Sequence, residues 1–239
     1  MFKILNKIKF SSEANRMKSV ASTDVAIEIF NSTKSKNLKF LLKQRFDWMN
    51  NFINENDIGL EVGSGAGFTR FYIKNKNFKM SDLSEDSHLD FKNIDAQATG
   101  FKDNSFNYVI ASNMIHHIPY PIKFFREMHR ILKKDGKLII HEAYCSLVFQ
   151  IITIIMKHEG FDFTLDAWDE KKPKSNENNA WDGNIAVPHL IFDDKKKFND
   201  NLGKFFSLEY EKLTECLIFL NSGGVTSKTF FIPLPEIFL

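Results

Sequence analysis

Hydrophobic residues first recur at helical spacing in the N-terminal quarter of the chain. A short helical pattern covers residues 25–30, and a longer amphipathic one runs from Leu38 to Ile53 before residues 54–57 end it. After residue 57, short apolar runs alternate with helical patterns. These runs predict strands at 58–62, 78–82, 91–94, 106–112 and 137–141, and helices that start at Phe68 and cover 121–132 and 195–206.

Strands that alternate with helices predict an α/β fold. Right-handed crossovers between such strands give a doubly wound, Rossmann-like sheet that is mostly parallel and covered by helices. Four units follow along the chain. They are an N-terminal helical cap (1–54), an α/β core (55–145), a helix with an inserted segment (146–204) and C-terminal strands that complete the sheet (205–239).

The inserted segment 157–190 is polar and has no clear periodicity. Segments of this length inside a domain are often lids or binding loops. We therefore predict a mobile lid that closes over the carboxyl edge of the sheet. A static structural insertion is the alternative, in which Trp168 and Trp181 anchor the segment to the core.

Net charge and cysteine content indicate which partners and which cell compartment to expect. The net charge of the 239-residue chain is +2, so a nucleic-acid substrate is not expected. Cys145 and Cys216 are not at metal-ligand spacing and are too few for a disulfide framework, and no metal is expected. These features favour a reducing, cytoplasmic location.

No segment is long enough to predict a membrane span. The first ten residues mix lysines with apolar residues and are not followed by the long apolar run of a signal peptide. The longest apolar stretch, 147–156, is about half of the roughly 20 residues that a spanning helix needs. Peripheral contact of this stretch with a membrane is an alternative to a core-packed helix.

A glycine loop and three acidic positions carry the chemistry. Residues 63–67, Gly-Ser-Gly-Ala-Gly, follow a predicted strand and open a helix, where glycine lets the backbone approach a ligand. Glu61 ends the strand before the loop, Asp82 ends the second strand, and Asp95-Ala96 follows the third. All of them fall at the carboxyl edge of the sheet, where ligands bind in open α/β folds.

In these features the chain resembles the class I S-adenosylmethionine (SAM)-dependent methyltransferases, in their broad small-molecule branch. The resemblance covers roughly residues 48–145. It rests on the glycine loop with its preceding acid, the acid after the second strand, the run before the fourth strand, the segment after that strand and the turn into the fifth strand. These are residues 61–67, 82–84, 95–96 with 101–107, 113–118 and 130–138.

The resemblance implies roles for individual positions toward SAM. Gly63 and Gly65 back its amino-acid end, Ser64 between them is a further cofactor-binding residue, and Glu61 holds the loop and the ammonium group. Asp82 binds the ribose hydroxyls, Asp95 and the Ala96 backbone meet adenine, and the Asn113 backbone lies near the methionine part. Only twelve residues separate Asp82 from Asp95, so the helix that the family places there is predicted to be short or lost.

Histidines near the predicted pocket are candidates for acceptor chemistry. His116 and His141 are candidate general bases, the latter next to Glu142, because histidine transfers protons near neutral pH. His117 and Trp181 are candidate acceptor contacts. The alternative for the pair 116–117 is structural, with one ring in the core and one bonded to a loop.

The expected reaction is attack of an acceptor on the methyl group of SAM. The acceptor is a small molecule, a glycan or a lipid-linked compound, which the sequence does not specify further. A catalytically inactive SAM-binding regulatory protein is the main alternative. An NAD-dependent oxidoreductase is a further one, since glycine loops also occur in dinucleotide-binding domains.

Overall fold

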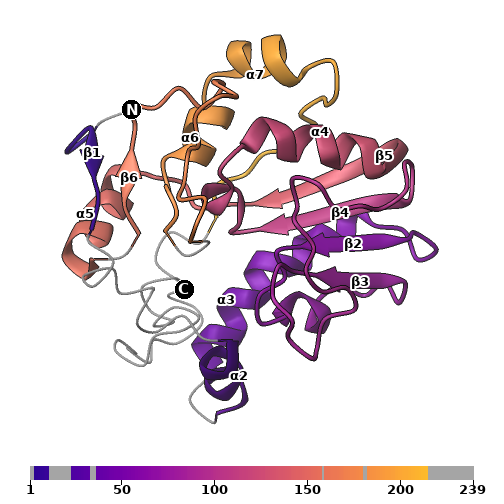
Figure 1. Ribbon diagram of the computed structural model, residues 1–239. Helices are drawn as coiled ribbons and strands as arrows, with labels where there is room; N and C mark the ends of the chain where they lie inside the picture. The colour runs from indigo at the N-terminus through magenta and orange to yellow at the C-terminus, as the bar shows by residue number, and fades with distance from the viewer. Residues whose placement is uncertain (1–2, 11–22, 33–35, 158, 180–181, 215–239) are drawn as a thin grey trace.

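The computed structural model describes residues 3–10, 23–32, 36–157, 159–179 and 182–214. Its centre is a four-stranded, all-parallel sheet in the order β3-β2-β4-β5 (Figure 1). The fold is therefore α/β and Rossmann-like, as the sequence predicts. The strands are β2 (Gly59–Val62), β3 (Phe78–Ser81), β4 (Phe106–Ser112) and β5 (Leu132–His141).

The remaining elements surround this sheet and include a small second sheet that the sequence did not predict. That sheet pairs β1 (Lys7–Ile8) antiparallel with β6 (Phe161–Asp162). The α-helices are α2 (Thr23–Asn31), α3 (Lys36–Phe46), α4 (Pro121–Ile131), α5 (Leu147–Met156), α6 (Val187–Phe192) and α7 (Lys195–Leu202). Short 3-10 helices are η1 (Asp47–Phe52), η2 (Phe68–Phe71) and η3 (Ile115–His117).

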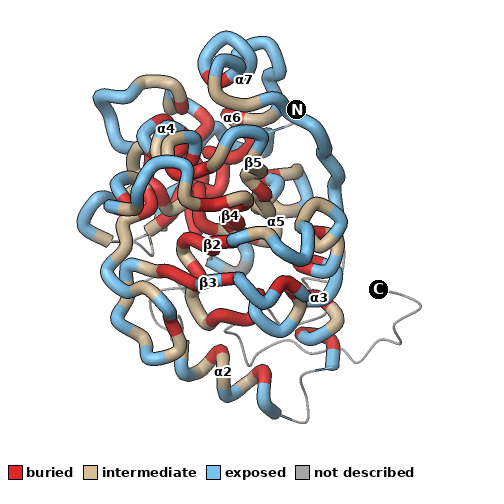
Figure 2. Tube along the Cα trace, turned by 90° about the vertical axis from the view of Figure 1, so that its right-hand side faces the viewer, coloured by how far each residue is buried: buried red, intermediate tan, exposed pale blue. Residues whose placement is uncertain are grey.

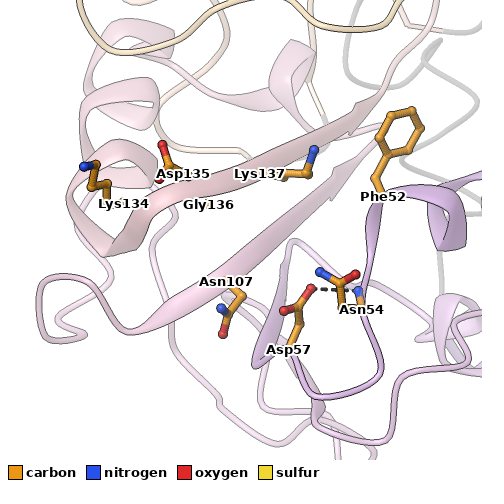
Figure 3. A pocket seen from close by; sticks show the side chains of 8 residues that line it. All are labelled: Phe52, Asn54, Asp57, Asn107, Lys134, Asp135, Gly136 and Lys137. Atoms are coloured by element: carbon orange, nitrogen blue, oxygen red, sulfur yellow. Dashed lines mark hydrogen bonds between the residues drawn. The ribbon is translucent and has the colours of Figure 1, made fainter.

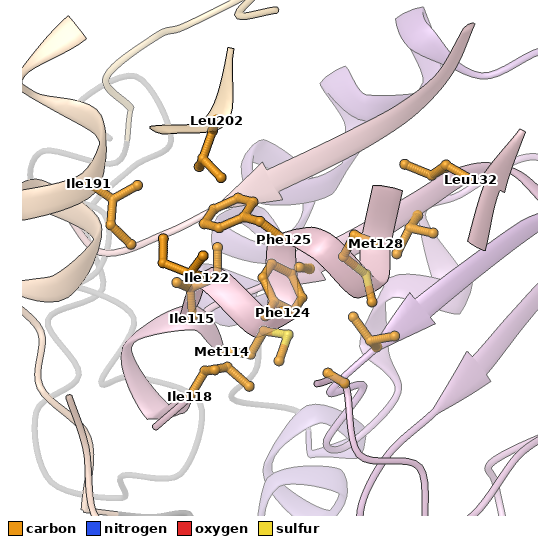
Figure 4. Packing of buried hydrophobic residues seen from close by; sticks show 14 of the residues in the cluster. Met114, Ile115, Ile118, Ile122, Phe124, Phe125, Met128, Leu132, Ile191 and Leu202 are labelled. Carbon is orange, nitrogen blue, oxygen red and sulfur yellow. The ribbon is translucent and has the colours of Figure 1, made fainter. Parts of the chain in front are cut away.

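One face of the sheet is covered by α4, α6 and α7. Side chains alternate along a strand, and Val109 and Ala111 of β4 point to this face. Phe124, Phe125 and Met128 of α4 meet them and are fully buried (Figure 4). Burial of one such side chain contributes about 1.5–3 kcal/mol.

The opposite face packs against α2, α3 and η1. Tyr108 and Ile110 alternate with the previous pair and point to this face. Leu41, Leu42 and Met49 of the N-terminal segment lie in the same cluster and are fully or almost fully buried. Both faces of the sheet are thus covered, which explains why β2, β3 and β4 are mostly buried (Figure 2).

Two predicted elements are corrected. The strand expected at 91–94 is reduced to a single bridge between Ser81 and Phe91, because Asn93 has a left-handed backbone with φ of 57° that ends any extended run. The helix expected from Phe68 is only the 3-10 turn η2, and no helix forms between Asp82 and Asp95, as the short spacing predicts. Described residues 205–214 contain no strand, and 215–239 lie outside the described residues.

Ser175 and residues 182–190 of the insertion are bonded to, or packed in, the core. The Asn184 amide donates to the His116 carbonyl at 2.8 Å, and the Ser175 hydroxyl donates to the His117 carbonyl at 2.5 Å. Ile185 and Val187 are almost fully buried. These contacts favour the static alternative for this part of the segment, whereas the lid prediction for the whole of 157–190 stays a prediction.

Amide hydrogen exchange tests the choice between lid and static insertion. We expect the amides of Asn184, Ile185 and Val187 to exchange as slowly as those of β4 without any ligand, because all three donate to backbone carbonyls. The exposed Lys171 amide, bonded only to a side chain, serves as the fast control. Fast exchange throughout 182–190 that slows with cofactor and acceptor would instead support a lid.

Helix α5 has an inverted polarity. Gln150 and Thr153 are completely buried, whereas Val148, Ile151 and Ile155 are 57%, 43% and 74% exposed. The Gln150 side chain accepts from the Ile4 amide and donates to the Cys145 carbonyl, both at 3.1 Å, so its burial is compensated. Within the described ranges, no helix is both long and apolar enough to cross a bilayer.

Candidate cofactor site

The glycine loop leaves β2 and turns back over the carboxyl edge of the sheet. Gly63, Gly65 and Gly67 all have positive φ, between 50° and 70°, a backbone region that glycine enters without penalty. Apart from its chain neighbours, no described residue would lie within 4 Å of a Cβ on Gly65, so the loop presents bare backbone there. Ser64 closes the loop onto β3 by donating its amide to the Ser81 carbonyl at 3.1 Å.

Asp82 lies at the end of β3, directly beside this loop. Its Oδ2 accepts the Gly65 amide at 2.9 Å and its Oδ1 accepts the Ser84 amide at 3.0 Å. A carboxylate has about four acceptor positions, so two remain for hydroxyl donors. The side chain is half-buried and therefore accessible to a ligand. His88, which the sequence did not single out, bonds the Gly65 carbonyl through Nε2 at 2.7 Å.

Glu61 is buried beneath the loop with one oxygen unused. Its Oε1 accepts the Thr69 hydroxyl at 2.5 Å, while Oε2 is buried and has no hydrogen-bond partner among the described residues. Burial raises the pKa of Glu61 to about 7, against the opposing hydrogen bonds from Thr69 and Ser64. A cationic group beside Oε2 would stabilise the charged form, and this matches a site for an ammonium.

The raised pKa of Glu61 predicts a pH-dependent stability. Between about pH 4.5 and 7 only the folded state keeps this proton, so the free energy of unfolding falls as pH rises through that window. We expect Glu61→Gln to remove this component, on the order of 3 kcal/mol. Denaturant unfolding of both proteins at pH 4.5 to 8, without ligand, measures it. Parallel pH profiles of wild type and variant would contradict the prediction.

Asp95 and Ala96 occupy a turn beside the sheet. The Asp95 Oδ1 accepts the Gln97 amide at 2.8 Å, so this carboxylate caps a turn. Ala96 is 5% exposed and belongs to the core cluster under α4. Asn113, after β4, has φ of 51° and donates its amide to the His141 carbonyl at 2.7 Å. Contact of these three residues with adenine or methionine stays a prediction.

The adjacent histidines after β4 lie among buried carboxylates. The His116 Nδ1 is 2.6 Å from Glu142 and its Nε2 is 3.1 Å from Glu159, while the His117 Nε2 is 3.5 Å from the other Glu159 oxygen. Burial by itself would lower the pKa of His116, but the two carboxylates raise it to about 10. Burial alone would raise the pKa of Glu142, but the positive charge of His116 and the hydrogen bonds that Glu142 accepts from His116 and Ile115 lower this pKa.

This environment favours the structural alternative for His116. At neutral pH an imidazolium has no lone pair with which to accept a proton, so His116 is poorly suited to act as a base. His141, at the end of β5, is half-buried, and its Nδ1 lies 3.3 Å from the Asn113 side-chain amide. It is the better placed of the two candidate bases. Trp181, the other predicted acceptor contact, lies outside the described residues.

The part of the sequence that forms most of this site is similar to a known protein family. Residues 60–140 match the family profile described as "Methyltransferase domain". This range begins in β2, contains the glycine loop and Asp82, and ends in β5. Over this segment, the sequence is similar to the SAM-dependent methyltransferases.

Individual relatives share parts of this methyltransferase domain. The chain is 35% identical over 97 residues to an uncharacterized protein, MJ0638, of Methanocaldococcus jannaschii, covering 37% of this chain and 42% of that protein. It is 30% identical over 95 residues to the ubiquinone/menaquinone biosynthesis C-methyltransferase UbiE of Citrifermentans bemidjiense, covering 36% and 40%. The matches thus span less than half the length of these curated relatives.

Among solved structures, the PH0226 protein of Pyrococcus horikoshii is 24% identical, with a TM-score of 0.40. The likeness covers 47% of this chain and 61% of that one.

Two pockets lie near opposite edges of the methyltransferase sheet. One of about 120 Å³ is lined by residues at the amino ends of the strands, such as Asp57, Asn107 and Gly136 (Figure 3). The other, of about 370 Å³, is lined by α2, the glycine loop, η2 and the segment after β3. Ligands of open α/β folds bind at the carboxyl edge, so only the second pocket adjoins the cofactor site.

The residues present fit SAM, the cofactor that the family implies. The unpaired Oε2 of Glu61 suits the ammonium, the open space over Gly65 suits a ligand in close contact with backbone, and the remaining acceptor positions of Asp82 suit ribose hydroxyls. Sequence reasoning missed His88 and Thr69 at the cofactor site and Glu159 beside the two histidines. They carry no motif, and they reach the site only through the fold.

Proposed function

We propose that the chain transfers the methyl group of SAM to a small-molecule, glycan or lipid-linked acceptor. The single observation that carries this proposal is the coincidence of the methyltransferase-domain match with the carboxyl-edge site. Within one matched segment lie the bare backbone at Gly65, the half-buried Asp82 carboxylate and the unpaired oxygen of Glu61. These groups complement three different parts of SAM.

In this proposal the protein mainly aligns the two reactants. SAM carries a sulfonium leaving group, which supplies the chemical activation. The loop and the acids would hold its amino-acid and ribose parts, so that the acceptor meets the methyl group in a fixed geometry. An oxygen acceptor would also lose a proton, and His141 is the candidate to take it. His117 and Trp181 remain proposed acceptor contacts.

Calorimetry tests the cofactor before any acceptor is known. We expect S-adenosylhomocysteine, the demethylated product, to bind in the micromolar range and NAD not to bind. Binding of NAD instead would support the oxidoreductase alternative. Transfer of labelled methyl from SAM into small-molecule and lipid extracts then separates an enzyme from the inactive regulatory alternative, which binds the cofactor and transfers nothing.

We also propose peripheral contact of α5 with a lipid surface, which would suit a lipid-linked acceptor. The exposed apolar face of α5 supports it, and Lys3 and Lys7 lie in the N-terminal segment bonded to that helix. Ile155→Ser should reduce sedimentation with anionic phospholipid vesicles several-fold. Ile58→Ser, a matched change of an exposed isoleucine at the amino edge of the sheet, should not. Equal sedimentation of the two variants would contradict the contact.

A further inference from the structure

Two adjacent histidines and a glutamate more than forty residues further on bring metal-ligating atoms together near the carboxyl edge of the sheet. His116 and His117 belong to η3, directly after β4, whereas Glu159 follows α5. One ligand atom from each residue lies within 4.8 Å of the other two. Glu159 and His116 are almost fully buried, with side-chain exposures of 2% and 6%.

The distances in this cluster suit a divalent cation. Zinc binds histidine nitrogen and carboxylate oxygen at about 2.0–2.2 Å, so two ligands of a tetrahedral site lie about 3.3 Å apart. The His116 Nε2 and the His117 Nε2 lie 3.1 Å and 3.5 Å from the Glu159 carboxylate. Small side-chain rotations would bring all three ligands to coordination distance.

A second carboxylate supports His116 in the way that metal-bound histidines are usually supported. The Glu142 carboxylate lies 2.6 Å from the His116 Nδ1, which fixes the tautomer and directs Nε2 toward Glu159. Glu142 is itself held by the amides of Met114 and Ile115, at 2.7 Å and 2.5 Å. A ring nitrogen that donates to a carboxylate while the other binds the ion is the common arrangement around protein-bound zinc.

Charge and packing point the same way. Glu142 and Glu159 are buried carboxylates, and their two negative charges are neutralised by one divalent ion when both histidines are neutral. Gly183 packs against the cluster, since a Cβ there would lie 2.8 Å from the His117 Nδ1 and 3.1 Å from both the Glu159 Oε2 and the His116 Cδ2. Both histidine carbonyls accept bonds from the insertion, so the ligands are held in place.

We propose that His116, His117 and Glu159 form a binding site for a divalent cation of the zinc class, with Glu142 as the partner of His116. Three protein ligands leave a fourth position for water or an anionic ligand. The cation would take the place of the proton that otherwise lies between the His116 Nε2 and Glu159. It would tie the insertion to the loop after β4, close to the carboxyl edge where the methyl acceptor is proposed to bind.

The test uses the full chain without a histidine tag, stripped with a chelator and then equilibrated with Zn²⁺ or Co²⁺. We expect about one Zn²⁺ per chain by elemental analysis at micromolar free metal. The Co²⁺ form should absorb visible light as strongly as a four- or five-coordinate ion does. His117→Gln and Glu159→Gln should each weaken binding at least about 100-fold, and Glu142→Gln about ten- to a hundredfold. His129→Gln, an exposed histidine on α4, is the matched control and should keep one equivalent.

Two results would overturn the site. One is a folded wild type that binds no stoichiometric Zn²⁺ or Co²⁺. The other is folded His117→Gln and Glu159→Gln proteins that bind metal as the wild type does. Circular dichroism establishes folding of each variant. If Glu159→Gln does not fold, Gly183→Ala replaces it. The added methyl group would push against His116, His117 and Glu159 and move them out of place. Unchanged metal affinity in that variant counts against the site.

Discussion

Gly65→Val should abolish binding of S-adenosylhomocysteine, with a loss of at least about 100-fold in affinity. The reason lies in the space over the loop. Apart from its two chain neighbours, no described residue has an atom within 4 Å of the Cβ position, so the valine side chain would occupy the volume that a ligand needs rather than clash with the core. The left-handed backbone at this position, with φ of 50°, adds strain of about 1–2 kcal/mol for any residue other than glycine.

Gly100→Val separates that steric effect from backbone strain. Gly100 also has a positive φ, 72°, and no described residue beyond its chain neighbours lies within 4 Å of its Cβ position, but it lies in the exposed loop before Phe101. Both variants should lose similar thermal stability, and only the Gly65 variant should lose the ligand. Calorimetric titration together with thermal unfolding of the two proteins measures both effects. Normal binding by a folded Gly65→Val protein would remove the loop from the cofactor site.

Asp82→Ala should weaken S-adenosylhomocysteine about ten- to a hundredfold. Hydrogen bonds to a charged group contribute about 1.5–3 kcal/mol, and the variant removes the acceptors proposed for the ribose. It also removes the bond that holds the Gly65 amide, so the loop loses a restraint. Asp82→Asn, which keeps one acceptor oxygen but not the charge, should give an intermediate loss.

Glu85→Ala is the matched control for Asp82. Glu85 lies three residues further on, is exposed, and accepts a hydrogen bond from Asn93 on the surface. Its removal should change affinity by less than about twofold, within the effect of one screened surface charge. Equal affinities of wild type and Asp82→Ala would contradict the role of Asp82. Equal losses in the Asp82 and Glu85 variants would point to a general effect of charge on this loop.

Local patterns in the sequence determined the elements and one edge of the site. Alternating apolar runs predict β2, β3, β4 and the second half of β5, and Pro121 marks the start of α4, because these signals depend on residues close in the chain. Parallel strands bring their carboxyl ends to one edge of a sheet. The proximity of Glu61, the glycine loop and Asp82 therefore follows from the order of elements alone.

Only the tertiary structure decided the remainder, because it depends on contacts between distant segments. Phe91 is apolar and suits a strand, yet the chain turns at Asn93 before a ladder forms. The polarity of α5 is inverted, since Gln150 finds buried partners that no periodicity reveals.

The same holds for the histidine cluster. Two adjacent histidines predict neither a base nor a ligand until Glu142 and Glu159 are placed against them. Those carboxylates lie 26 and 43 positions from His116 in the sequence, and only the paths of β5 and the insertion bring them to its two nitrogens. Because the charge state of a buried group is set by its neighbours in space, the chemistry of His116 was decided by the fold and not by the motif.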